Sequence, residues 1–157
     1  MPGVVADTHA VIWYLSRSPR LTSAAAASMH KAVSDGYHIE VPSISLVEVT
    51  YLVEKGRLPA LVLNKLAEHL DQPGAGLRVA VLDRRVAEAL AQVSRAQVPD
   101  LPDRIIAATA LSLGLPLITA DHKIRRPASP PSGSAITLRA SPPPRCAWTD
   151  TRCRPAT

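Results

Sequence analysis

Four acidic residues of this sequence stand where their side chains could act together. Asp7 and Asp121 each follow a short apolar segment typical of a buried strand, and Glu48 and Asp103 fall in the first turns of expected helices. In open parallel α/β sheets, ligands bind at the carboxyl ends of the strands, and the helices that leave those strands begin at the same edge. The sequence therefore predicts that the four carboxylates converge on one cleft.

Carboxylates gathered in this way repel one another. The repulsion of two unit charges 4 Å apart is about 1 kcal/mol in water and about 4 kcal/mol at an effective dielectric near 20. A cation among the acids relieves that repulsion. Oxygen ligands without Cys or His suit Mg²⁺ or Mn²⁺ rather than Zn²⁺. Such a metal can activate a water against a phosphodiester, so the cluster predicts metal-dependent hydrolysis of that bond.

Each acid also has a purely structural explanation. Ser45 and Glu48 match the capping box Ser-x-x-Glu, which satisfies the amino end of a helix. A carboxylate in the first turn of a helix, as at Asp103, is favoured by the helix dipole. Asp7 and Asp121 could cap the helices that follow them. Pattern alone leaves both explanations open, since it does not establish that the acids meet.

The elements that must position these acids alternate along the chain. Short apolar segments, bounded by Gly, Pro or Asp, are separated by longer segments with helical character, which predicts an α/β fold with a parallel sheet and helices on both faces. The expected strands are residues 4–6, 38–41, 77–82 and 116–119, and the expected helices are residues 9–15, 23–36, 45–55, 59–70, 84–95 and 105–113.

Composition fits one globular domain. The chain has 157 residues, 46% of them hydrophobic and 20% charged, and its core must be aliphatic because it contains no Phe. Apolar runs fall short of the roughly 18–20 residues that span a bilayer. The amino terminus has an acid at position 7 and no basic segment, unlike a signal peptide. We therefore expect a cytoplasmic protein without a membrane partner.

The last part of the chain differs in kind. Of the 18 basic residues, six follow Ile124, and of the 13 acidic residues only Asp150 does, so the net charge of +5 belongs entirely to this segment. It also holds seven of the 15 prolines and both cysteines, which lack His neighbours and predict neither a zinc site nor a disulfide. We expect a domain over residues 1–125 and an unstructured Pro/Arg-rich tail over 126–157.

The acids lie in segments that resemble one known family. The segment from Asp7 to Leu15, Asp-Thr-His-Ala-Val-Ile-Trp-Tyr-Leu, is similar to the opening strand–helix motif of PIN-domain proteins, particularly VapC toxins of bacterial toxin–antitoxin pairs. Residues 44–48, Ile-Ser-Leu-Val-Glu, resemble the second motif. Residues 101–110 and 115–124 resemble the third and fourth, in the family's order. The resemblance covers residues 4–124, nearly all of the expected domain.

The resemblance implies a PIN-like fold and a Mg²⁺-dependent endoribonuclease that cuts RNA, often tRNA or rRNA, while a VapB-type antitoxin holds it inactive. It also implies a homodimer. Thr119 matches a hydroxyl position beside the site, where it would orient a water or phosphate, and Thr8 could contribute similarly. The acidic metal-binding positions it implies are Asp7, Glu48, Asp103 and Asp121.

The chain departs from the family after the fourth acid. Family members continue within a few residues into a closing strand, whereas here Arg125 begins the Pro/Arg-rich segment, as a changed reading frame or an appended tail would produce. One alternative is therefore a catalytically inactive PIN-fold remnant that only binds its antitoxin. A second is a phosphatase with Asp7 as nucleophile, although such enzymes carry another Asp two residues on, where this chain has His9.

Overall fold

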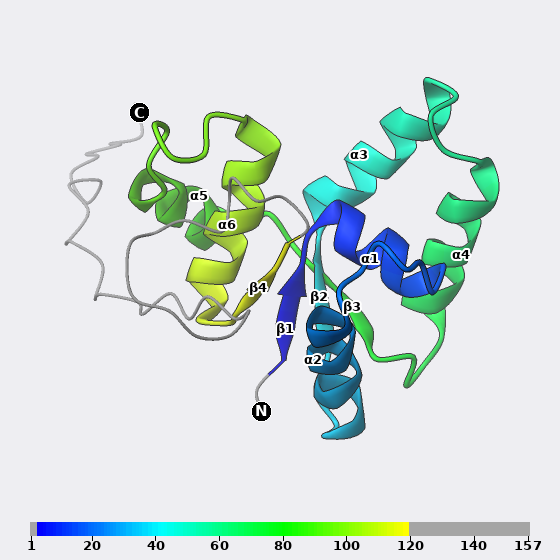
Figure 1. The fold of residues 1–157 in the computed structure, drawn as a ribbon. Helices are drawn as coiled ribbons and strands as arrows, with labels where there is room; N and C mark the ends of the chain where they lie inside the picture. The colour runs from blue at the N-terminus through cyan, green and yellow to red at the C-terminus, as the bar shows by residue number, and fades with distance from the viewer. Residues whose placement is uncertain (1–2, 120–157) are drawn as a thin grey trace, which may run out of the picture.

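The fold is built on four parallel strands, shown in Figure 1. The structure, a computed structural model, describes residues 3–119. The strands lie in the order β3-β2-β1-β4, with β1 paired to both β2 and β4. The predicted α/β class with a parallel sheet is thereby confirmed. The strands are β1 (Val4–Ala6), β2 (Ile39–Pro42), β3 (Leu77–Ala80) and β4 (Leu117–Ile118).

Helices cover the sheet on both sides. Figure 1 shows α5 and α6 to one side of β1 and β4, and α1, α2 and α4 to the other. Helix α2 contacts β1 and β2, α4 contacts β3, and α6 contacts β1. The helices are α1 (Thr8–Leu15), α2 (Ser23–Ser34), α3 (Ser43–Glu54), α4 (Ala60–Asp71), α5 (Arg84–Ala89) and α6 (Leu101–Leu113), with a 3₁₀ turn, η1 (Leu90–Gln92), after α5.

The two faces of β1 bury different clusters. Val4 and Ala6 pack in a core with α1, α2 and α4, whereas Val5 packs with Ile106 of α6. Successive side chains of a strand point to opposite faces, so a strand buried on both sides is apolar throughout. The uninterrupted Val-Val-Ala of β1 is therefore the sequence of a central strand.

Local signals fix several helix ends. The side chains of Thr22 and Asp83 cap α2 and α5 by accepting hydrogen bonds from the backbone N–H groups of the third residue on, at 3.3 and 3.0 Å. Gly114 ends α6 in the left-handed conformation, with φ 64°. These three ends agree with the sequence prediction.

Several boundaries differ from it, including the start of α6, which is Leu101 rather than residue 105, and the end of β3, which is Ala80 rather than residue 82. Helix α3 begins at Ser43, directly after Pro42, so Ser45 lies inside the helix and the predicted Ser45–Glu48 capping box is wrong. Pro42 is the N-cap of α3 and provides no side-chain cap. Helix α5 ends at Ala89, well before residue 95, because the chain turns into η1.

Several predictions concern residues beyond the described part. Asp121, the proposed boundary at residue 125, and the Pro/Arg-rich tail over 126–157 all lie outside residues 3–119. Among the helices within that range, none has both the length and the apolar character that crossing a bilayer requires.

Candidate active site

The strand order creates a switch point at the carboxyl edge of the sheet. From β1 the chain builds β2 and then β3 on one side, and later returns to place β4 on the other side of β1. Ligands of open α/β sheets bind outside the carboxyl ends of the strands where the order reverses in this way. Asp7 directly follows β1 and Thr119 directly follows β4, so both residues stand at that point.

Asp7 is held there by both of its carboxylate oxygens. Its Oδ1 accepts a hydrogen bond of 2.6 Å from the backbone N–H of Ala10 and so caps α1. Its Oδ2 accepts a hydrogen bond from the Thr119 hydroxyl. The two residues are 5% and 7% exposed. The carboxylate is therefore nearly buried and fixed in direction by two elements that are distant in sequence.

A second carboxylate–hydroxyl pair lies beside the first. Thr8, the residue after Asp7, is buried, and its hydroxyl donates a hydrogen bond to Oε2 of Glu48 on α3. Helices α1 and α3 are in contact. Because Thr8 follows Asp7 directly, its hydrogen bond holds Glu48 at the same edge as Asp7. The role of Thr8 in this structure is thus to bind the Glu48 carboxylate.

Asp103 reaches this edge on another helix. It is the third residue of α6, which packs against β1 and α3, and it is half-buried. Because α6 leads into parallel strand β4, its amino end lies at the carboxyl edge of the sheet. Within residues 3–119, no three His, Cys, Asp or Glu side chains form a group that could hold a metal ion. The fourth predicted acid, Asp121, lies beyond that range.

The donors at this edge are hard oxygens. They are the carboxylates of Asp7, Glu48 and Asp103 and the hydroxyls of Thr8 and Thr119. Mg²⁺ prefers oxygen ligands, keeps several of its waters, and needs only one or two protein carboxylates. This donor set therefore fits Mg²⁺ or Mn²⁺ and does not resemble a zinc site.

Comparison with known proteins agrees with this geometry. Residues 4–130 match the family model of the PIN domain. The chain belongs to the PIN-domain family. It is 28% identical over 130 residues to Ribonuclease VapC22 of Mycobacterium tuberculosis, an alignment that covers 80% of this chain and 92% of the relative.

A solved structure has the same fold. The crystal structure of VapBC2 from Rickettsia felis, bound to a DNA fragment from their promoter, superposes with a TM-score of 0.59 at 17% identity, covering 78% of this chain and 91% of the matched chain. The predicted resemblance to PIN domains of the VapC type is thereby confirmed.

An arginine of this PIN domain braces the helix that carries Asp103. Nη2 of Arg104 donates hydrogen bonds to the backbone carbonyls of Leu90 and Val93, at 3.3 and 3.1 Å. Both carbonyls lie beyond Ala89, the last residue of α5, and the carbonyl of Leu90 also accepts a hydrogen bond from the backbone N–H of Val93. The bonds tie the first turn of α6 to η1.

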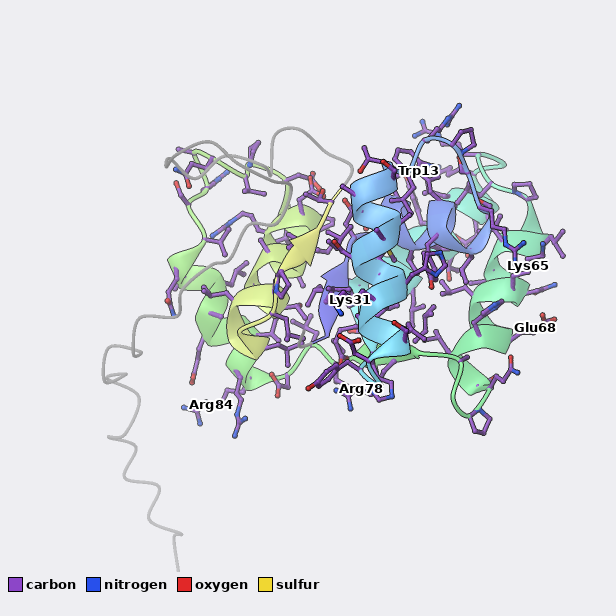
Figure 2. The ribbon with its side chains drawn as sticks, turned by 60° about the horizontal axis from the view of Figure 1, so that its bottom comes forward. Trp13, Lys31, Lys65, Glu68, Arg78 and Arg84 are labelled. Atoms are coloured by element: carbon purple, nitrogen blue, oxygen red, sulfur yellow. The ribbon has the colours of Figure 1, made fainter. Side chains whose placement is uncertain are left out.

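Sequence reasoning missed an ion pair inside the sheet. Glu40 of β2 is 4% exposed and aligns with Arg78 of β3 in the strand register. Nε of Arg78 donates a hydrogen bond of 3.0 Å to Oε1 of Glu40, and this bond raises the pKa of Arg78. Figure 2 labels Arg78. The sequence did contain a signal for this ion pair: Glu40 lies within an expected buried strand, and a buried carboxylate requires a partner.

The PIN domain also has a cleft formed by residues of α1, α2, α4 and β3 and the loops beside them, with a volume of about 630 Å³. Trp13 (Figure 2), Tyr14 and Leu21 supply much of its apolar lining, and His30 and His69 add polar groups. Tyr14 and His30 share a hydrogen bond of 3.2 Å, and burial raises the pKa of Tyr14. Asp7, Glu48 and Asp103, the predicted acids within residues 3–119, do not line this cleft.

Proposed function

We propose that this PIN-domain protein is a metal-dependent endoribonuclease and the toxin of a VapBC-type toxin–antitoxin pair. The observation that carries the proposal is the fixed, nearly buried carboxylate of Asp7 at the switch point, with Glu48 held beside it through Thr8. The similar M. tuberculosis protein is named a ribonuclease, which supports the same activity here.

The proposed metal is Mg²⁺, with Mn²⁺ as a substitute. Asp7 and Asp103 would be the main ligands, with Glu48 and Asp121 completing the site directly or through bound waters. When bound, the ion supplies an activated water and charge stabilisation for hydrolysis of a phosphodiester. Within residues 3–119, no three acidic, His or Cys side chains form a group that could hold a metal ion. The proposal is compatible with this, because Mg²⁺ requires only one or two direct carboxylate ligands.

The residues of the chain itself prepare this site. The N–H of Ala10 and the hydroxyl of Thr119 hold the two oxygens of Asp7 in place before any ligand arrives. Thr8 does the same for one oxygen of Glu48. Donors placed in advance need not be reorganised during the reaction, which is a main source of catalytic power. Thr119, beside the site, is also placed to orient a water or a phosphate oxygen.

The proposed substrate is RNA, of the tRNA or rRNA class. Residues 1–124 carry no net charge, because the chain's excess of +5 lies after Ile124. Binding of phosphates by this part of the chain would therefore depend on the metal more than on a basic surface. Cleavage should accordingly respond more strongly to metal removal than to a moderate rise in salt.

The proposed partner is a VapB-type antitoxin. The R. felis structure is a VapBC complex, which supports such a partner for this chain. We propose that the antitoxin binds in the cleft beside α1, α2 and α4, whose volume of about 630 Å³ and mixed apolar and polar lining suit side chains of a peptide segment. Trp13→Ala should weaken antitoxin binding, measured by calorimetry, and leave cleavage by the free protein unchanged.

We further propose a homodimer that uses the outer face of α3. Val47 and Tyr51 lie one turn apart on this helix and are exposed, as is Leu101 on α6, which contacts α3. Exposed apolar side chains one helical turn apart, such as Val47 and Tyr51, are typical of an interface. Tyr51→Arg should shift the protein from dimer to monomer in sizing with light scattering, whereas a monomeric wild-type protein would rule out the dimer.

The nuclease proposal is tested with total RNA and the full chain. Wild-type protein should cleave RNA with Mg²⁺ or Mn²⁺ and lose this activity in EDTA. Asp103→Asn should abolish cleavage while the thermal unfolding profile stays close to wild type. The matched control is Asp71→Asn, an exposed acid at the end of α4, which should cleave normally. Cleavage in EDTA, or by Asp103→Asn at the wild-type rate, would refute the proposal.

The same assay decides the inactive alternative. A folded wild-type protein that binds the antitoxin but cleaves no RNA with either metal would favour a PIN-fold remnant. A covalent aspartyl-phosphate on Asp7 would instead favour a phosphatase.

A further inference from the structure

Within residues 3–119, two buried side-chain atoms have no hydrogen-bond partner, Nε of Arg104 and Oγ of Ser45. Ser45 is 0% exposed, and its hydroxyl makes no hydrogen bond in the structure. Buried hydroxyls nearly always form hydrogen bonds, because a buried hydroxyl without a partner destabilises the folded protein. A small apolar side chain at the same place would not carry this cost. Ser45 therefore calls for an explanation, and capping of α3 is excluded because Pro42 is the N-cap.

The position of Ser45 relates it to the acids. It lies three residues before Glu48 on α3, and residues so spaced are neighbours on one helix face. Side chains of a helix lean toward its amino end, which for α3 is the carboxyl edge of the sheet. Ser45 thus stands between Glu48 and that edge, on a helix that contacts both α1 and α6.

The other buried hydroxyls of residues 3–119 are bonded. Thr8 donates to Glu48, Thr119 donates to Asp7, and Thr109 donates to the carbonyl of Ile105 at 2.8 Å. The packing of this domain therefore satisfies hydroxyl groups where protein acceptors are near. Residues 3–119 supply no partner for Ser45, which leaves a bound water as the candidate that we consider.

We propose that Ser45 is a positioning residue of the metal site, whose hydroxyl hydrogen-bonds a water in the hydration shell of the bound divalent cation beside Glu48. Mg²⁺ keeps several waters, and these need acceptors and donors around them. Groups that hold such outer ligands typically change metal affinity or activity by 10–100-fold when removed. This inference rests on the proposed function, since it requires a divalent ion at the acids.

The test compares thermal unfolding of the metal-free protein with the rise in Tm produced by MnCl₂. Ser45→Ala removes an unsatisfied hydroxyl and introduces a better helix former, so the metal-free Tm should rise by about 2–4 °C. The Mn²⁺-induced rise in Tm should shrink, with an apparent Kd for Mn²⁺ raised about 10-fold or more. Ser45→Cys, which keeps a side chain at the same place with a weak donor, should show the same loss of Mn²⁺ binding.

Ser43→Ala is the matched control. Ser43 is two residues earlier on the same helix, and its hydroxyl oxygen already accepts a hydrogen bond of 3.1 Å from the backbone N–H of Leu82. This variant should leave the Mn²⁺-induced rise in Tm unchanged. A Ser45→Ala protein with wild-type Mn²⁺ affinity would overturn the inference, as would one that is less stable without metal. A wild-type protein that shows no response to Mn²⁺ would instead overturn the proposed metal site itself.

Discussion

The double role of Asp7 makes its two simplest substitutions behave differently. In Asp7→Asn the side chain keeps one oxygen that can accept from the N–H of Ala10, and its amide can donate to the Thr119 hydroxyl, which accepts as well as donates. In Asp7→Ala both contacts disappear. We expect both variants to lose RNA cleavage, but only the alanine variant to lose stability.

The size of that loss follows from the two contacts. Removing an N-cap costs about 0.5–2 kcal/mol. A buried hydroxyl left without its acceptor costs about 1–3 kcal/mol, and Thr119 is 7% exposed. Asp7→Ala should therefore lower the free energy of unfolding by about 3 kcal/mol, which for a chain of this length lowers Tm by roughly 10 °C. Asp7→Asn should remain within about 1 kcal/mol of wild type.

Two measurements on the same preparations test this reasoning. Unfolding is followed by circular dichroism during heating in EDTA, so that metal binding does not contribute, and cleavage of total RNA is followed with Mg²⁺ present. Equal destabilisation by Asn and Ala would show that the contacts of Asp7 do not set its contribution to stability. Cleavage by Asp7→Asn at the wild-type rate would remove Asp7 from the active site.

Three other substitutions probe the remaining contacts. Thr8→Val removes the donor to the α3 carboxylate and should slow RNA cleavage about 10–100-fold at unchanged fold; an unchanged rate would make that bond irrelevant to activity. Arg78→Met leaves the buried Glu40 carboxylate unpaired and should lower the free energy of unfolding, measured in urea, by about 1–3 kcal/mol. Adding Glu40→Leu should restore that free energy. If it does not, Arg78 stabilises the protein through its own packing. Gly76→Ala should lower Tm more than Gly74→Ala. Both residues have positive φ, but only at Gly76 would an added Cβ meet a side chain of α2, at 2.6 Å. Equal losses of Tm would show that α2 shifts to make room for the Cβ.

Much of the fold was predictable because local signals and the global pattern agree. The strand at residues 4–6, the helix start at residue 84 and the helix end at residue 113 were all predicted, and the structure follows them. Boundaries failed where tertiary contacts decided. Helix α5 ends early, at Ala89, and Arg104 from a later helix bonds to the carbonyls of Leu90 and Val93 just beyond that end. No pattern local to residues 84–95 contains that information.

The sequence predicted which residues form the candidate site better than it predicted the contacts between them. Asp7 could be placed at the edge of the sheet because it follows the first strand, whereas Thr119 was expected to end the last strand and was placed beside the site only by the family resemblance. The hydrogen bond between Thr8 and Glu48 depends on how α1 meets α3, which spacing does not encode. Ser45 was misassigned for a related reason: the Ser-x-x-Glu spacing suits a cap, but β2 passes straight into α3 and puts the start of the helix two residues earlier.

The switch point between β1 and β4 also sets when the site can exist. Asp7 and Thr119, joined by a hydrogen bond, are 112 residues apart in sequence. At synthesis rates of roughly 5–20 residues per second, a ribosome that has made the first strand needs on the order of 6–20 s more to make the last. Throughout that interval the growing chain has its first acid but not the strand that completes its surroundings. The hydrogen bond that fixes Asp7 can therefore form only after nearly all of the described residues have been synthesised.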